Sequence, residues 1–95
     1  MAASISKEEI TTQLQELYDW NLIDNAIQKE WIFKDFNTAI VFINVVAHLA
    51  EQHDHHPDIL NTYNRVQLRL HTHSAKGITR RDFLLAKSID QSLGP

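Results

Sequence analysis

One segment of the chain, residues 36–52, is apolar over far more of its circumference than a surface helix needs. A helix that covers a core with one face requires an apolar stripe about 100° wide. The apolar residues of this segment are Phe36, Ala39, Ile40, Val41, Phe42, Ile43, Val45, Val46, Ala47, Leu49 and Ala50. The pattern predicts a helix with Asp35 as its N-cap, one face of which packs on a sheet.

The surplus apolar surface of this helix needs a second partner, and a short chain has little else to offer. We therefore expect a homo-dimer or homo-tetramer in which the Phe36-Gln52 helix packs against its copies. Val45 and Leu49 are the candidates for the outward face of that helix.

Outside residues 36–52, turn residues separate short segments whose apolar residues recur at helical or strand spacing. We expect helices over 7–18 and from Thr79 onward, and strands over 20–23, 26–33, 59–61 and 65–73. Asp24-Asn25 tolerates the positive φ of a tight hairpin. The order α-β-β-α-β-β-α predicts one α+β sandwich domain over residues 1–95, in which helices cover one face of a four-stranded, largely antiparallel sheet.

The composition excludes several classes of function. The chain has 95 residues, no cysteine and a formal net charge of −3. Without cysteine there are no disulfides, thiolate metal ligands or cysteine nucleophiles. The acidic balance argues against direct binding of nucleic acid. Residues 1–10 do not resemble a signal peptide, and no apolar run is long enough to span a membrane. We expect a cytoplasmic protein.

Histidine is the unusual component of the sequence. The six histidines are His48, His53, His55, His56, His71 and His73. His55 and His56 follow the long predicted helix, and His73 ends the last predicted strand. If those two ends meet, three imidazoles converge at one site. Imidazole titrates near neutral pH, so such groups can give and take protons.

Carboxylates near these histidines are harder to assign from the sequence. Asp82 stands three positions after Thr79, which predicts a capping pattern at the start of the last helix. Glu51 and Asp54 lie near the end of the long helix, where they could assist the histidines. No carboxylate partner for each imidazole ring is evident.

The order of these residues resembles the pterin-4a-carbinolamine dehydratases. The family pattern combines an acidic or basic residue, His-His-Pro, an aromatic residue, a later His and a final Asp at set gaps. The matching residues are Glu51, His55, His56, Pro57, Tyr63, His73 and Asp82. Trp20 and residues 33–37 also resemble the family, so the likeness covers essentially the whole chain. Two positions depart from the family: Ile59, where an aromatic ring is frequent, and His71, where a small hydroxyl residue is common.

The resemblance implies dehydration of a 4a-hydroxytetrahydropterin, the by-product of pterin-dependent aromatic amino acid hydroxylases, to the quinonoid dihydropterin. It implies catalysis by His55, His56 and His73, with His55 and His73 as acid and base and His56 chiefly binding substrate. The implied substrate-binding residues are Glu51, Asp54, His55, His56, His71, Thr72, His73 and Ser74. Because the substrate is itself the pterin, neither a cofactor nor a metal is expected.

Two alternatives remain open. His53, His55, His71 and His73 form two His-x-His pairs, which could hold zinc with an open position. Some members of the resembled family also act as dimerisation cofactors of a transcription factor. A regulatory protein partner would then use the apolar helix over residues 36–52.

Overall fold

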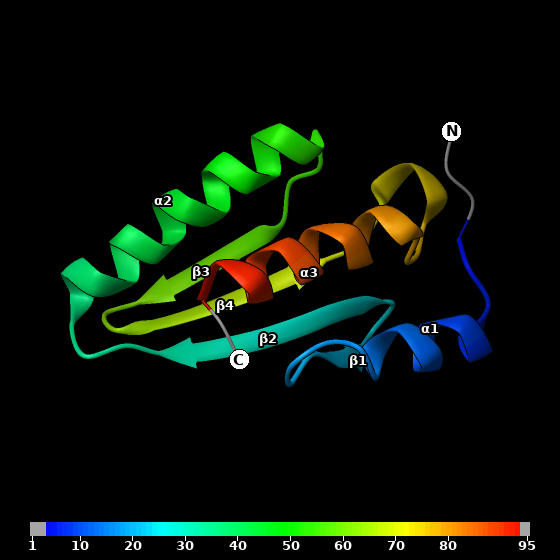
Figure 1. Cartoon of the computed structure of the whole chain (residues 1–95), viewed down its shortest axis with the longest axis horizontal. Coiled ribbons are helices and arrows are strands. Elements are labelled where there is room, and N and C mark those ends of the chain that lie inside the picture. Colours follow the sequence, from blue (N-terminus) through cyan, green and yellow to red (C-terminus); the bar gives the residue numbers. More distant parts are fainter. Residues whose placement is uncertain (1–3, 94–95) are drawn as a thin grey trace.

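The chain folds into a four-stranded antiparallel sheet with its helices packed on one face, as the computed structural model of residues 4–93 shows (Figure 1). The elements are α1 (Lys7–Leu14), β1 (Asn21–Ile23), β2 (Ala26–Ile32), α2 (Phe36–His53), β3 (Asp58–Thr62), β4 (Arg65–Leu70), the 3₁₀ helix η1 (His73–Ala75) and α3 (Arg80–Leu93). The predicted α+β class is confirmed. The start of segment 1–10 and the end at Gly94 and Pro95 lie outside the described residues.

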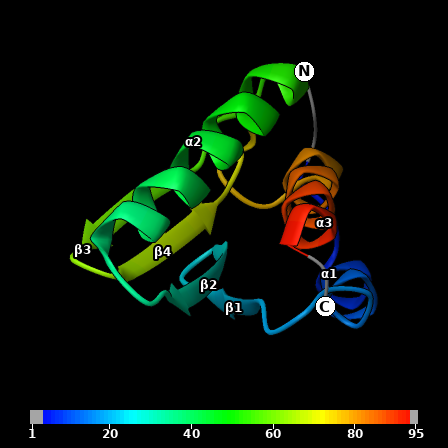
Figure 2. The same ribbon diagram turned by 60° about the vertical axis from the view of Figure 1, so that its left-hand side comes forward.

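The strand order is β1-β2-β4-β3, and every neighbouring pair is antiparallel. Ile27 pairs with Leu70 and Trp31 with Val66, so these four side chains share the sheet face that the helices cover. Figure 2 shows α2 and α3 on that face. The two hairpins turn where the chain takes a left-handed conformation, including the predicted Asp24-Asn25 turn.

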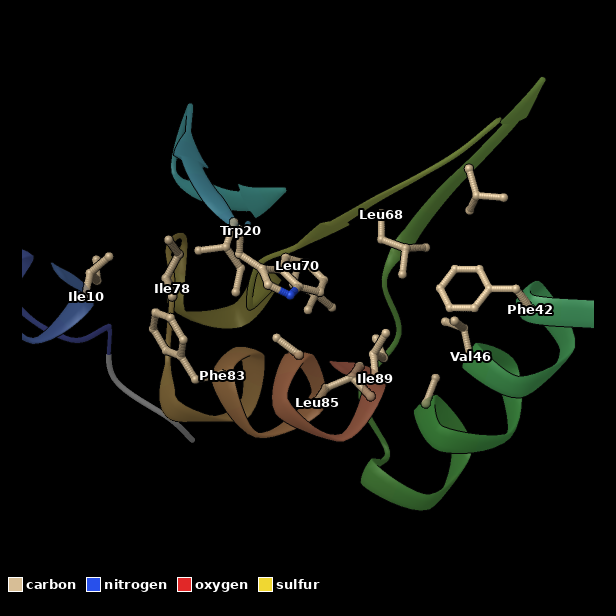
Figure 3. Packing of buried hydrophobic residues seen from close by; sticks show 14 of the residues in the cluster. Ile10, Trp20, Phe42, Val46, Leu68, Leu70, Ile78, Phe83, Leu85 and Ile89 are labelled. Carbon is tan, nitrogen blue, oxygen red and sulfur yellow. The ribbon is translucent and has the colours of Figure 1, made fainter. Parts of the chain in front are cut away.

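The core lies between the sheet and the helices (Figure 3). Leu68 and Leu70 of β4 meet Phe42 and Val46 of α2 and Ile89 of α3, and all five are at most 3% exposed. Full burial of one such side chain contributes about 1.5–3 kcal/mol. This core holds α2 and α3 against the same face of the sheet.

Helix α2 begins where Asp35 accepts a hydrogen bond from the Thr38 backbone N–H at 2.8 Å, which confirms the predicted N-cap. Its outward face carries Val41 and Val45, 54% and 39% exposed. Leu49 packs against the core, so its expected outward position is wrong. The apolar surplus of the helix is therefore smaller than the sequence pattern suggests.

Two predicted elements are too long. The first helix ends at Leu14 instead of Tyr18, because the chain reverses at Asp19 (φ 63°) and the Asp90 carboxylate accepts hydrogen bonds from the Tyr18 N–H and the Trp20 ring. The last strand ends at Leu70 instead of His73, since its pairing with β2 stops there.

None of the helices within residues 4–93 has both the length and the apolar character required to cross a membrane.

Candidate functional site

The carboxyl end of α2 is shaped by a left-handed residue, Asp54, with φ 47° and ψ 46°. Its N–H bonds to the Glu51 carbonyl, and the N–H of His55 bonds to the Ala50 carbonyl at 3.0 Å. This pair of bonds is a Schellman motif, in which Asp tolerates the left-handed position better than most residues. The turn sends the chain back toward the body of the protein and directs His55 inward.

His55 is buried, and its ring lies against a carboxylate from the first turn of α3. Its Nε2 atom lies 2.5 Å from Oδ1 of Asp82, which is fully buried. The second oxygen of Asp82 accepts hydrogen bonds from the Thr79 N–H and the Thr72 hydroxyl, both at 2.9 Å. The bond from Thr79 confirms the predicted capping pattern of α3. One carboxylate thus caps a helix and holds an imidazole.

The contact with Asp82 sets the tautomer of the His55 ring. An ionised carboxylate only accepts hydrogen bonds, so the Nε2 atom must carry the hydrogen. In the neutral ring the other nitrogen, Nδ1, then has a free lone pair. Nδ1 makes no hydrogen bond to any residue from 4 to 93. The described structure thus leaves this nitrogen without a partner, while Nε2 is held by Asp82.

Two further histidines pair with carboxylates. Nε2 of His56 lies 2.6 Å from Glu51, and both side chains are exposed. Nε2 of His71 lies 3.3 Å from Asp58. Carboxylate partners that were not evident from the sequence are therefore present for His55, His56 and His71. Such pairs orient a ring by fixing which nitrogen carries the hydrogen.

Asp58 was not predicted as a site residue, and Asp82 was predicted mainly as a helix cap. The one available signal for Asp82 was its match to the last acidic position of the family pattern. Both carboxylates become partners only through tertiary contacts that place them beside His71 and His55.

The two histidine-bearing segments, residues 53–58 and 71–82, meet at one end of the molecule. The Arg81 side chain donates to the Asp54 carbonyl, and this contact joins the start of α3 to the end of α2. The pairs of His55 with Asp82 and of His71 with Asp58 add two more links between the segments. Figures 1 and 2 both show the end of α2 beside the loop that leads into α3.

Other expected site residues occupy different settings. His73 begins the 3₁₀ helix η1 and is exposed, as is Ser74, and the His73 ring has no hydrogen bond within the described residues. Thr72 is 3% exposed, and its hydroxyl points inward to Asp82 instead of outward to a ligand. His53 bonds to Ser88 of α3 at 2.9 Å, which ties it to helix packing.

The alternative of a zinc site requires a cluster of metal-ligating side chains. Across residues 4–93, no group of three or more His, Asp or Glu side chains is arranged to hold a metal ion. The histidines of the two His-x-His pairs occupy different settings. His55 is buried against Asp82, His53 bonds to Ser88, and His73 is exposed on η1.

Comparison with known proteins places the chain in a family. Residues 3–92 match the model of the pterin 4 alpha carbinolamine dehydratase family. Relatives that carry the name pterin-4-alpha-carbinolamine dehydratase include a protein of Picosynechococcus sp., 45% identical over 96% of this chain and 99% of its own length. Another, of Chloroflexus aurantiacus, is 47% identical over 95% of this chain and 97% of its own.

One solved structure agrees with this placement, and a second shows the fold. A transcriptional coactivator/pterin dehydratase from Brucella melitensis superposes with a TM-score of 0.90 at 38% identity, over 96% of this chain and 99% of that chain. A pterin dehydratase-like RuBisCO assembly factor of the alpha-carboxysome has a TM-score of 0.64 at 19% identity, over 82% of this chain and 90% of that one, and shares the fold alone.

The fold and the matched sequence together define a lyase built on an α+β sandwich. The chain belongs to the pterin 4 alpha carbinolamine dehydratase family. The family and the enzyme class predicted from the sequence are confirmed.

Proposed function

We propose that the protein dehydrates 4a-hydroxytetrahydropterin to the quinonoid dihydropterin by acid–base catalysis with histidines. The observation that supports this most directly is the buried His55–Asp82 pair, which leaves Nδ1 of His55 without a partner in the described structure. A neutral imidazole with one oriented N–H and one free lone pair is equipped to accept a proton.

The reaction needs two proton transfers. A proton goes to the C4a hydroxyl, the C4a–O bond breaks and water leaves, while the N5–H proton is removed and a C4a=N5 double bond forms. Nδ1 of His55 would accept the N5 proton, and Asp82 would stabilise the resulting imidazolium through Nε2. His73, exposed just beyond Thr72, would supply the proton to the departing hydroxyl.

Substrate binding would fall to the exposed groups around this pair. His56, oriented by Glu51 at 2.6 Å, has its Nδ1 side available for a polar edge of the pterin. Asp54, His71 and Ser74 complete the expected set at the rim. No cofactor enters the scheme, because the pterin that reacts is the substrate. In the cell the enzyme would act in the cytoplasm and return the pterin to aromatic amino acid hydroxylases.

Self-association through α2 is the second part of the proposal. Val41 and Val45 are exposed on one side of the helix, and Phe36 at its start is 49% exposed. Burying these side chains between copies would remove apolar surface from water at about 25 cal/mol per Å². The same surface is the candidate site for a regulatory protein partner, a role suggested by the similar Brucella melitensis protein, which is called a transcriptional coactivator.

A spectral assay tests the proposed function. A pterin-dependent hydroxylase generates the 4a-carbinolamine, and its dehydration is followed with and without the protein. We expect the protein to accelerate the decay in proportion to its concentration. A decay rate that does not change at any enzyme concentration would refute the proposal.

A further inference from the structure

A directed series of hydrogen bonds lies behind His55 and runs through three segments of the chain. The Thr72 hydroxyl, just beyond β4, lies 2.7 Å from the Thr79 hydroxyl and 2.9 Å from Oδ2 of Asp82. The backbone N–H of Arg81 donates to the Thr79 hydroxyl at 3.2 Å. Asp82 then contacts His55 at the end of α2.

The direction of each bond in the series follows from the chemistry of its members. The Asp82 carboxylate only accepts, so Thr72 must donate its single hydroxyl hydrogen to it. Thr72 can then only accept from Thr79, whose own oxygen accepts from the Arg81 N–H. Every hydrogen therefore points toward Asp82. Bonds that point the same way polarise one another, which strengthens the series.

Burial separates this series from solvent. Thr72, Thr79 and Asp82 are 3%, 1% and 0% exposed. Every side-chain nitrogen or oxygen that is itself shielded from solvent within the described residues has a hydrogen-bond partner, so the unbonded Nδ1 of His55 is an atom that solvent can reach. Removing one hydroxyl would therefore leave an unmatched polar group in a dry site, which is costly.

The backbone around Thr72 holds it in place. Its N–H donates to the Gly77 carbonyl at 2.8 Å, and its carbonyl accepts from Ala75 at 3.1 Å. The loop over residues 72–77 is thereby closed on Thr72, so its side chain has a set position beside the start of α3. His73 follows directly on the exposed side of the same loop.

We propose that Thr72 is a positioning residue, whose hydroxyl keeps Asp82 oriented so that Nε2 of His55 carries the hydrogen and Nδ1 stays free. This inference rests on the proposed function for its effect on turnover. Thr72 contacts no substrate through its side chain; it acts through Asp82. Thr72, which is buried next to the exposed His73, therefore has a role distinct from substrate binding.

The test compares Thr72→Val with Thr72→Ser. Valine keeps the shape but removes the hydroxyl, and serine restores it. Long-range proton–nitrogen NMR spectra, with the ring in its neutral state, report which nitrogen of His55 carries the hydrogen. We expect the Nε2–H form in the wild type and in Thr72→Ser. In Thr72→Val only the Thr79 N–H still holds Oδ2 of Asp82, so the carboxylate leaves Nε2 for part of the time and the Nδ1–H fraction increases. Loss of one hydrogen bond to a charged group should lower turnover about tenfold or more in Thr72→Val.

Thr62→Val, on the exposed face of β3, is the matched control and should change neither readout. Thr72→Ala serves as a second variant without the hydroxyl if Thr72→Val does not fold. A folded hydroxyl-free variant with the wild-type tautomer and turnover would overturn the inference. A wild type without dehydratase activity would instead refute the proposed function, and the tautomer comparison would still decide the role of Thr72.

Discussion

The Nε2 atom of His55 lies 2.5 Å from Oδ1 of Asp82, although the two residues are 27 positions apart in the chain. The contact joins the end of α2 to the first turn of α3. It couples the helix cap of α3 to the orientation of the proposed catalytic ring, so only a substitution that keeps the cap separates the effect on turnover from the effect on folding.

Asp82→Asn should reverse the tautomer of His55 while keeping the cap. The Asn carbonyl can still accept from the Thr79 N–H and the Thr72 hydroxyl, which turns the amide NH₂ toward His55. Nε2 must then accept, and Nδ1 carries the hydrogen. We expect turnover to fall by roughly 10²–10⁴-fold, the range for general acid–base catalysis. Asp82→Asn with full turnover and a reversed tautomer would rule out Nδ1 as the base.

His55→Ala and His73→Ala should each lower turnover by roughly 10²–10⁴-fold if each residue transfers a proton. The assay is the spectral one, with the uncatalysed decay subtracted. His53→Ala is the control, because His53 bonds to Ser88 in the packing of α2 on α3 and has no proposed proton to transfer. A larger loss in His53→Ala than in His55→Ala, with folding intact, would show that the roles are assigned to the wrong histidines.

Local patterns were sufficient for much of the fold. Strand β4 was predicted because Val66, Leu68 and Leu70 alternate with polar residues, and all three are fully buried in the structure. The caps at Asp35 and at Thr79 were also predictable, since a cap is formed within four residues of the chain. In each case the residues that determine the element lie within or next to that element in the sequence.

Long-range contacts account for what the sequence did not reveal. The end of α1 depends on Asp90, which is 72 positions from Tyr18. Asp90 also pairs with Lys29 at 3.1 Å, so the lysine that interrupts an apolar face of β2 is neutralised by a residue of α3. The carboxylate partners of His55 and His71 depend in the same way on how the helices and strands pack, and no local rule identifies them.

The outward face of α2 predicts self-association. Val45→Asp should raise the dissociation constant of the oligomer by more than 100-fold, since a buried unpaired charge costs about 3–5 kcal/mol. Sedimentation across a concentration series measures the change. Thr11→Asp, exposed on α1 away from α2, is the control and should leave assembly intact (Figure 1). A wild type that is strictly monomeric at micromolar concentration would contradict the proposed interface.

Removal of metal should leave turnover unchanged. The imidazole–carboxylate pairs give no support here, because zinc ligands are oriented by the same kind of pair. A metal would, however, compete with protons for the imidazoles that transfer them. Exhaustive chelation, with metal content measured before and after, should not affect the assay, and added zinc should be neutral or inhibit by binding His55, His56 or His73. Activity that is lost with the metal and returns with it would favour a metalloenzyme.

The cap of α2 predicts a specific dependence of stability on pH. Hydrogen bonds from Thr38, first from its hydroxyl and then from its backbone N–H, hold the pKa of Asp35 below the ordinary value of 3.8, against a small opposing effect of burial. Because the folded-state pKa is the lower one, the contribution of the charged cap is present above pH 3.8 and is lost as the pH falls through the folded-state value.

Asp35→Asn isolates this contribution, since Asn is an equally good N-cap that does not titrate. Urea midpoints of both chains, followed by circular dichroism between pH 6 and pH 3, give the comparison. The difference in urea midpoint between the wild type and Asp35→Asn should be constant above about pH 5. As the pH falls below 3.8, the midpoint of the wild type should decrease relative to that of Asp35→Asn. Other titrating groups are common to both chains and cancel. A difference that stays constant down to pH 3 would mean that the charge of Asp35 does not stabilise the start of α2.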